Sequence, residues 1–344
     1  MKEDLKELNP KIKLSYITGL RSVVLKEIKG KNFHILKENI DSVYLSNVQN
    51  LDEIKKLNSV TRAYIVLQSS KYNPHYISNH KSVLGNLIDK VISDNENKFK
   101  AFKITCAGSD SPEVRSISKH IHNTYKIIEK EEADLKIHII KPNDMWEVGV
   151  QITPRPLSSR EYRVKNMSGA MDPTIAYAVN SFCNLSKAKT YLNVFSGSAT
   201  LLIDAGQSYE NIEDLVGFDN NKKHLSLAMQ NIKKAELIKK IRIKEADIFN
   251  RPDFGKFDVI TSDLPFGMSI SKDEDLEKLY KIFIEYCQES LNTGGRMVVY
   301  TSEHEIFEKF IQESRFKILK VLKLKFMTSV NAYLRPRIFV CKLK

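Results

Sequence analysis

The chain has 344 residues, of which 42% are hydrophobic and 28% are charged, and this balance excludes a disordered chain and predicts a soluble globular protein. Its length exceeds the usual size of one domain, so we expect two or three domains. The formal net charge of +12 favours a polyanionic partner such as nucleic acid.

Cysteine usage and apolar runs bear on the compartment. Cys106, Cys183, Cys287 and Cys341 are far apart and form no CxxC pair, which is typical of reduced thiols and excludes a disulfide framework or a zinc site. The amino terminus lacks the apolar stretch of a signal peptide, and no apolar run approaches the length of a membrane span. We therefore expect a cytoplasmic protein.

Residues 1–70 alternate short apolar strands with helical segments. Their periodicity predicts the order β-α-β-β-α-β, with elements at residues 12–17, 20–28, 33–36, 42–45, 51–57 and 61–67. This order is typical of a ferredoxin-like domain.

Residues 71–153 are expected to form a second α/β unit, with a helix at 83–92 and strands at 101–106, 135–140 and 146–152. A further helix begins after Ser111, because Ser favours the cap and the following Pro favours the first turn. Arg115 and Lys119 give this helix a basic face.

Three histidines of this second unit, His120, His122 and His138, suggest a metal site at first sight. They lack the spacing to carboxylates or thiols that such a site needs. We therefore expect solvated or phosphate-facing histidines and no metal.

Residues 154–170 are rich in proline, serine and positive charge, which is typical of a linker between domains. A phosphate-binding segment and a merely solvated linker explain this composition equally well. The basic side chains that could meet phosphate are Arg155, Arg160, Arg163 and Lys165.

From Pro173 onward, helices and strands alternate, which predicts a doubly wound, mostly parallel sheet that a terminal hairpin closes. The expected helices cover residues 173–182, 201–205, 224–235, 276–291 and 306–313. The expected strands cover residues 190–195, 215–218, 241–244, 257–263, 296–300, 317–326 and 337–342.

Polar residues stand at the carboxyl ends of successive predicted strands, where open α/β sheets bind ligands. The turn from Asn193 to Thr200 is small and glycine-bearing, but it is not the GxGxxG of dinucleotide-binding proteins. Asp219 follows at the distance where a carboxylate takes two ribose hydroxyls, and Asp247 precedes apolar residues able to cover an adenine. These features together predict an adenosine site.

The strand at 257–263 ends at Asp263 and turns on Leu264, Pro265, Phe266 and Gly267. Asp263 offers acceptor oxygens, Phe266 offers a flat face, and the stiffened Leu-Pro backbone offers a carbonyl. This combination suits a planar nucleobase held by its amino group. An ordinary turn is about equally compatible with these residues, since Asp, Pro and Gly are common in turns.

Residues 160–342 resemble the class I, S-adenosylmethionine-dependent RNA methyltransferases that act on guanine N2. Residues 1–153 resemble the ferredoxin-like plus THUMP module of that group, and the nearest likeness is to tRNA guanine-N2 methyltransferases acting at position 6. The segment from Arg160 to Thr174 resembles the lead-in helix of the group. Asn193 to Thr200 resembles its methionine-binding loop, usually DPFCGSGT, and Asp263 to Gly267 its (D/N)PP(F/Y)G catalytic loop.

The resemblance implies a ferredoxin-like domain at 1–70, a THUMP RNA-binding domain at 71–153, a linker at 154–170 and a Rossmann-like class I methyltransferase domain at 171–344. It implies S-adenosylmethionine as cofactor and a monomer that binds RNA. The catalytic residues would be Asp263, Leu264, Pro265 and Phe266. The cofactor would be held by Asn193, Phe195, Ser196, Gly197, Ser198, Thr200, Asp219, Asn220, Asp247, Ile248 and Asp263.

Three residues depart from the pattern of the group. Asn193 stands where Asp is commoner and Ala199 replaces a Gly. Both changes are compatible with weaker cofactor binding, and neither abolishes the backbone cradle. Leu264 replaces a Pro, which keeps the carbonyl and removes rigidity.

The alternatives are guanine-N2 methylation of ribosomal RNA, adenine-N6 methylation, and a non-catalytic RNA-binding protein with a degenerate methyltransferase fold. A nicotinamide dehydrogenase is disfavoured by the missing GxGxxG.

Overall fold

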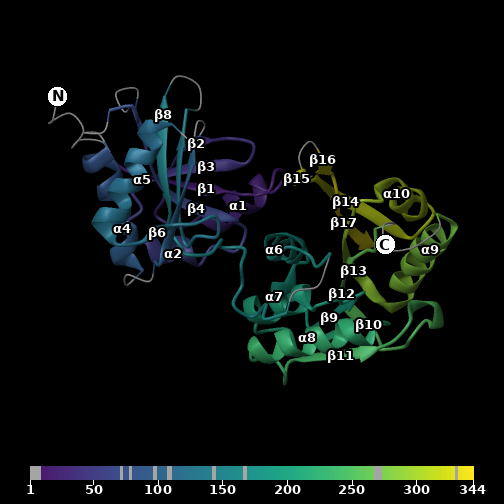
Figure 1. The fold of residues 1–344 in the computed structure, drawn as a ribbon. Coiled ribbons are helices and arrows are strands. Elements are labelled where there is room, and N and C mark those ends of the chain that lie inside the picture. The colour runs from purple at the N-terminus through teal and green to yellow at the C-terminus, as the bar shows by residue number, and fades with distance from the viewer. Residues whose placement is uncertain are drawn as a thin grey trace. The chain divides into compact units, whose positions relative to one another are not determined.

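The structure is a computed structural model, and it describes residues 9–69, 73–76, 80–95, 99–106, 111–141, 145–165, 169–266, 273–329 and 332–344. The chain folds into two compact units (Figure 1). The first consists of Met1–Tyr16 and Val24–Leu157, and the second of Ile17–Val23 and Ser158–Lys344. Gly267 of the predicted base-binding loop and residues 166–168 of the predicted linker lie outside the described residues.

The first half of the first unit has the predicted β-α-β-β-α-β order. Its four strands pair antiparallel in the sequence β4-β1-β3-β2, which is the ferredoxin-like arrangement, so this prediction is confirmed. The elements are β1 (Lys11–Ser15), α1 (Arg21–Ile28), β2 (His34–Glu38), β3 (Ser42–Ser46), α2 (Leu51–Lys55) and β4 (Arg62–Ser69).

The second half continues the same sheet, because β8 pairs antiparallel with β4. The full order is β2-β3-β1-β4-β8-β7-β5-β6, so strands from both expected N-terminal domains share one sheet. The division at residue 70 stays a prediction. The elements are the π-helical turn η1 (His80–Leu84), α4 (Gly85–Asp94), β5 (Ala101–Cys106), α5 (Pro112–Tyr125), β6 (Ile128–Glu129), β7 (Leu135–Ile140) and β8 (Trp146–Gln151).

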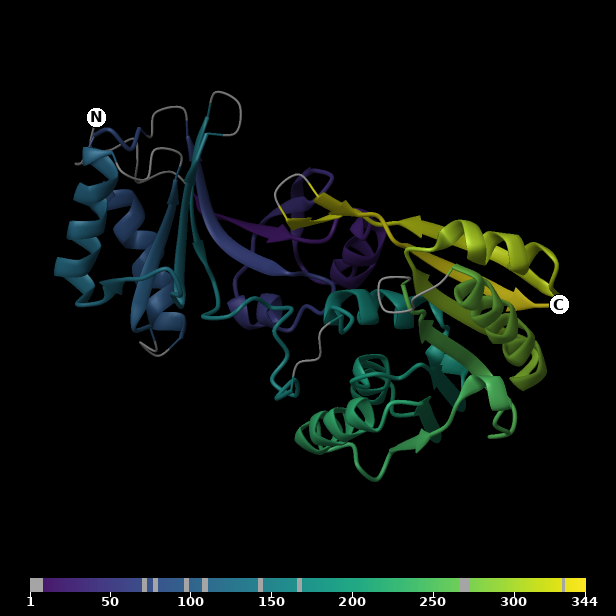
Figure 2. The same ribbon diagram turned by 45° about the vertical axis from the view of Figure 1, so that its right-hand side comes forward.

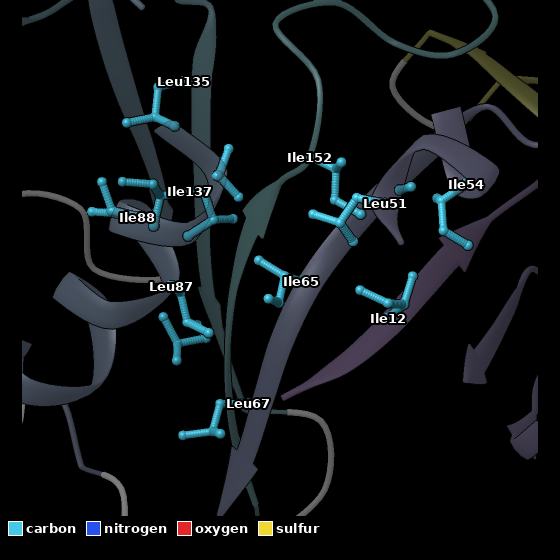
Figure 3. Packing of buried hydrophobic residues seen from close by; sticks show 14 of the residues in the cluster. Ile12, Leu51, Ile54, Ile65, Leu67, Leu87, Ile88, Leu135, Ile137 and Ile152 are labelled. Carbon is cyan, nitrogen blue, oxygen red and sulfur yellow. The ribbon is translucent and has the colours of Figure 1, made fainter. Parts of the chain in front are cut away.

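Strand alternation sends every second side chain of this sheet into one core. Ile12 and Ile65 on neighbouring strands pack with Leu51 and Ile54 of α2 and with Leu87 of α4 (Figure 3). Each buried side chain of this size contributes about 1.5–3 kcal/mol of transfer free energy, so the apolar pattern holds the helices on one face of the sheet.

The opposite face of this sheet carries a buried carboxylate, Glu147. Lys13 Nζ and His138 Nε2 lie 2.7 and 2.9 Å from one of its oxygens. Tyr44 and Gln68 donate to the other oxygen at 2.7 and 2.6 Å. Burial raises the pKa of Glu147, but these donors outweigh it and hold the pKa well below the usual range. The expectation that His138 is solvated or faces phosphate is wrong, because it partners Glu147.

The second unit contains a seven-stranded sheet of order β11-β10-β9-β12-β13-β17-β14, parallel except for β17, and this confirms the predicted doubly wound fold. The helices are α6 (Pro173–Phe182), η2 (Leu185–Lys187), α7 (Thr200–Ser208), α8 (Lys222–Lys234), η3 (Ile248–Asn250), α9 (Asp273–Ser290) and α10 (His304–Gln312). The strands are β9 (Thr190–Val194), β10 (Asp214–Asp219), β11 (Ile241–Glu245), β12 (Phe257–Asp263), β13 (Leu291–Thr301), β14 (Phe316–Lys323) and β17 (Arg337–Leu343).

The order of these strands reverses at β9, which has β10 on one side and β12 on the other. Such a switch point opens a crevice at the carboxyl ends of the strands. The loops after β9, β10 and β12 therefore converge there.

The end of the chain differs from the prediction in one respect. β14 and β17 pair antiparallel as expected, but a separate two-stranded sheet, β15 (Phe326–Ser329) with β16 (Ala332–Leu334), stands between them in the sequence. The expected strand at 317–326 is broken at Leu324, whose N–H donates to the carbonyl of Pro336 at 2.9 Å. The next N–H, from Lys325, donates to Thr18 of the same unit at 3.1 Å, so the chain leaves the main sheet.

The four cysteines are free, and all but Cys106 are buried, as expected of reduced thiols. Within the described ranges, no helix is both long and apolar enough to cross a membrane. The same ranges hold no cluster of three or more His, Cys, Asp or Glu that could bind a metal ion.

Candidate active site

A cavity of about 680 Å³ lies at the carboxyl ends of β9, β10 and β12. Every residue predicted to hold a cofactor or to act in catalysis lines it: Asn193, Phe195, Ser196, Gly197, Ser198, Thr200, Asp219, Asn220, Asp247, Ile248, Asp263, Leu264, Pro265 and Phe266. The structure thus brings residues from four loops of the second unit to one site.

The loop between β9 and α7 turns sharply against this cavity. Phe195, Gly197 and Ala199 have φ angles of +56°, +50° and +65°, and such a conformation costs a residue other than glycine about 1–2 kcal/mol. Neighbouring hydrogen bonds hold the turn, since Ser196 N donates to Phe218 O and Ala199 N donates to Ser196 O. The loop therefore presents backbone directly to the cavity.

Asp219 ties this loop to the end of β10. One carboxylate oxygen accepts the N–H of Gly197 and the other accepts the N–H of Asn221, both at 2.9 Å. His224 Nδ1 lies 3.4 Å from the second oxygen. Because a carboxylate has about four acceptor positions, Asp219 can still receive hydroxyl donors from a ligand.

Asn193 occupies the position where the resembling group usually has Asp. Its side-chain nitrogen donates to Thr261 O at 3.1 Å and to Val194 O at 3.3 Å, and the side chain is buried. The amide therefore joins β9 to β12, which a carboxylate cannot do because it has no N–H. These two bonds use the side-chain nitrogen, so the side-chain oxygen is still able to accept a hydrogen bond.

One wall of the cavity comes from the short helix η3. Asp247 caps it by accepting the N–H of Phe249 at 3.0 Å, which leaves its second oxygen available. Ile248 is buried, while the ring of Phe249 is 46% exposed, with Lys278 Nζ 5.6 Å from its centroid. This wall offers an acceptor beside two apolar surfaces, as predicted.

The loop after β12 is held on both sides. Leu264 N donates to the carbonyl of Tyr300 on β13 at 3.0 Å. Tyr280 of α9 donates to the carbonyl of Pro265 at 3.2 Å and contacts Thr301 Oγ1 at 2.6 Å. The rings of Phe266 and Tyr300 lie with 5.7 Å between their centroids. Residues 264–266 are therefore held by contacts with β13 and α9.

Asp263 begins this loop and lines the cavity, and no described side chain or N–H donates to its carboxylate. Burial raises the pKa of Asp263 to about 8. Asp263 is half-buried. A carboxylate that is partly removed from water without partners is costly, so its presence at a cavity favours a functional role over a structural one.

Comparisons with known proteins agree with this geometry. Residues 160–330 match the family model described as RMKL-like, methyltransferase domain (UPF0020). Over these residues the chain is therefore similar to a methyltransferase family.

Two relatives are named tRNA (guanine(6)-N2)-methyltransferase. The one from Thermus thermophilus is 27% identical over 194 residues, which is 56% of this chain and 57% of the relative. The one from Methanocaldococcus jannaschii is 24% identical over 234 residues, 57% of this chain and 61% of the relative. The chain therefore spans less than two thirds of the length of these relatives.

The crystal structure of TrmN from Thermus thermophilus superposes with a TM-score of 0.76 at 20% identity, covering 98% of this chain and 100% of that one. This likeness extends the shared fold beyond the methyltransferase domain to nearly the whole chain.

The sequence reasoning missed several residues that line the cavity. Asn221 and His224 are among them. Both follow Asp219, at the end of β10, by two to five residues, at the start of α8. Their closeness to Asp219 in the sequence could have indicated that they line the cavity.

The basic residues predicted to contact RNA are divided between the two units. Arg115 and Lys119 line a hollow of about 870 Å³ beside β5 and β6 of the first unit, and Arg155 is exposed in that unit. The other three belong to the methyltransferase domain's unit: Arg160 and Arg163 are half-buried, and Lys165 is exposed. The backbone of Lys165 is bound at N and O by the side chain of Asn231 on α8.

Proposed function

We propose that the chain transfers a methyl group from S-adenosylmethionine to the exocyclic N2 of a guanosine in RNA, with tRNA as the leading substrate. The observation that carries this proposal is Asp263. No described residue donates to its carboxylate. It begins a loop that β13 and Tyr280 hold at Leu264 and Pro265, and it lines the same cavity as the loops after β9 and β10. The names of the relatives support the choice of guanine N2 and of tRNA.

The cavity fits the cofactor by its polar atoms. Ser196 Oγ is buried, and the part of the chain that the structure describes gives it no hydrogen-bond partner. The loop after β9 lines the cavity, and the carboxylate of Asp219 retains free acceptor positions. S-adenosylmethionine supplies an electrophilic methyl group on a sulfonium sulfur. The bond between methyl and sulfur breaks, and its electron pair stays on the sulfur. Its ribose, adenine and methionine parts would be held by Asp219, by Asp247 with Ile248, and by the loop from Asn193 to Thr200.

Asp263 and the Leu264 carbonyl would orient the nucleophile. The lone pair of the guanine amine is delocalised into the ring, so the amine is a poor nucleophile. Hydrogen bonds from its two hydrogens to these acceptors turn the lone pair toward the methyl group. After transfer the amine releases one proton to solvent, so Asp263 acts by positioning and does not need to be a strong base. Positioning alone supplies large rate factors.

Phe266 would stack on the base, worth about 1–3 kcal/mol by analogy with single-strand binding. The base must leave its helix to reach the cavity. Stacking on Phe266 would then offset part of the free energy needed to unstack the base.

The rest of the chain would bind the RNA. We assign residues 1–70 to a ferredoxin-like domain, 71–153 to a THUMP domain, 154–170 to a linker and 171–344 to the catalytic domain. Phosphates would be contacted by Arg115, Lys119, Arg155, Arg160, Arg163 and Lys165, which set the register without reading sequence. We further propose a cytoplasmic monomer whose chemistry uses no metal.

Methyl transfer from labelled S-adenosylmethionine to total tRNA and to ribosomal RNA, followed by nucleoside analysis, tests the proposal. Wild type and Asp263→Asn are run side by side, because the amide keeps the shape and replaces one acceptor oxygen with a donor. Labelled N2-methylguanosine in tRNA that is lost in the variant is the expected result. Label in N6-methyladenosine would move the enzyme to the adenine class. No label together with no cofactor binding would leave a non-catalytic RNA-binding protein.

A further inference from the structure

The β15–β16 hairpin begins and ends at the edge of the main sheet that carries the catalytic loop, where the parallel strands have their carboxyl ends. Asp263 at the end of β12 pairs with Tyr300, near the end of β13. The next residue of β13, Thr301, pairs with Arg337 at the start of β17, and Arg337 also pairs with Lys323 at the end of β14. The strands that lead into and out of the hairpin therefore both reach the carboxyl-end rim. Figure 2 shows the hairpin, in yellow, extending away from the main sheet.

The base of the hairpin is fixed within its unit. Lys325 N donates to Thr18 O at 3.1 Å, and Leu324 is buried in the core. Gly19 has φ +102°, and a Cβ at this glycine would lie 2.2 Å from the carbonyl oxygen of Lys323. Only glycine allows this close approach. The contacts of residues 18 and 19 therefore fix the angle at which the hairpin leaves the sheet.

The surface of the hairpin combines aromatic, apolar and cationic groups. Tyr333 is 50% exposed and Met327 is 65% exposed. Lys325 Nζ lies 4.3 Å from the centroid of the Tyr333 ring, and Arg335, two residues after Tyr333, is exposed. Residues 316–344 contain eight Lys and Arg and no Asp or Glu, so the charge near the hairpin has one sign.

We propose that the β15–β16 hairpin is an RNA-binding arm of this chain, in which Tyr333 stacks on a base near the target nucleotide and Lys325 and Arg335 bind the adjoining phosphates. An aromatic face interleaved with cations is the combination that binds unpaired nucleic acid, because every base has a stacking face and every phosphate a negative charge. The substrate class rests on the proposed function. A base extruded from its helix leaves unpaired neighbours, which is the form of RNA that this surface fits.

The test measures RNA binding, cofactor binding and methyl transfer by the full chain, with total tRNA as the probe. The variants are Tyr333→Ala, Tyr333→Phe and the double variant Lys325→Ala/Arg335→Ala. The matched control is Lys317→Ala/Lys342→Ala, which removes two charges from exposed residues paired at the opposite end of β14 and β17.

Tyr333→Ala is expected to weaken RNA binding about 5- to 100-fold, the factor that corresponds to one stacked base. Tyr333→Phe is expected to retain binding, because it keeps the ring. The Lys325/Arg335 double variant should weaken binding and lower the slope of log K against log salt by about 1–2, whereas the control should change it less. All variants should bind S-adenosylmethionine as the wild type does.

Wild-type RNA affinity in both Tyr333→Ala and the Lys325/Arg335 variant would overturn the hairpin proposal, even if methyl transfer is intact. So would variants that bind RNA normally and lose a protein partner instead. Loss of RNA binding in these variants, when the wild type forms no methylguanosine, would uphold the RNA-binding arm and overturn the proposed reaction. The two proposals therefore fail separately.

Discussion

The phenol of Tyr280 donates a hydrogen bond to the carbonyl oxygen of Pro265, with 3.2 Å between the two oxygens. This bond joins the long helix α9 to the loop that carries Asp263. Leu264 stands where the resembling group has a proline, so the backbone was expected to be less rigid here. The hydrogen bond holds the backbone at the next residue, Pro265. Rigidity therefore comes from a contact with another element instead of from a second proline.

We expect Tyr280→Phe to lower kcat about tenfold or more and to leave cofactor affinity unchanged, because a small misplacement of the base-binding loop is costly to a reaction that depends on position. The matched control is Tyr286→Phe on the same helix, whose hydroxyl donates to Pro252 O at 2.8 Å and does not line the cavity. Each variant should lose about 1 kcal/mol of stability. Single-turnover methyl transfer and chemical denaturation check this, and equal rates in the two variants would contradict a positioning role.

The raised pKa of Asp263 predicts that the protein is less stable to unfolding at high pH. Burial raises its pKa to about 8, so the folded state holds a proton that the unfolded state has released between about pH 4 and pH 8. Its contribution to stability is therefore lost as pH rises through that window. Asp263→Asn should raise the melting temperature of the ligand-free protein, by little at pH 5 and by several degrees at pH 9.

Asp258, at the other end of β12, provides the control for this experiment. Burial raises its pKa, but donors led by the N–H of Lys189 and by Asn292 outweigh burial and lower it. Its contribution is present at neutral pH and is lost in acid, so Asp258→Asn should destabilise the protein at pH 7. If both variants shift the melting temperature in the same direction at pH 7, the assigned environment of Asp263 is wrong.

Ala199 and Ala205 separate backbone strain from packing. Both methyl groups are fully buried, but Ala199 has φ +65° and Ala205 lies within α7. Replacement by Gly removes the same methyl group at both positions, relieves strain at the first and adds helix cost at the second. Ala199→Gly should therefore be less destabilising than Ala205→Gly by about 2–3 kcal/mol, the sum of the strain relieved and the helix cost added. Urea denaturation measures both, and equal losses would show that the loop is not strained.

The sequence predicted the elements whose pattern is set locally. β12 is an apolar run that stops at Asp263, α5 follows a Ser-Pro start, and the strand-end rule placed Asp219 and Asp247 at the cavity. These predictions succeeded because strand alternation and cap chemistry depend on residues close in the chain.

The features that the sequence did not predict depend on partners distant in the chain. The run from Lys317 to Phe326 has no local break, and the strand stops only because Pro336 and Thr18 accept its next N–H groups. His138 projects from the sheet face opposite the helices, as the alternation indicates, but its partner Glu147 belongs to the next strand. Local periodicity cannot supply such partners.

Asn193 gives a last test of how the site is built. Its amide donates to Thr261 O and Val194 O, so Asn193→Asp replaces a donor with a carboxylate facing two carbonyl oxygens at a buried position. We expect a loss of about 1–3 kcal/mol or more at pH 8 that shrinks in acid, where a protonated carboxyl can donate again. Asn221→Asp is the control, because Asn221 also lines the cavity but accepts the N–H of Lys223 at 2.9 Å, which a carboxylate can do as well. Thermal unfolding at pH 5 and pH 8 distinguishes the two. An Asn193→Asp protein as stable as the wild type at pH 8 would show that the amide does not join β9 to β12, and that the departure from the usual Asp has no structural cause.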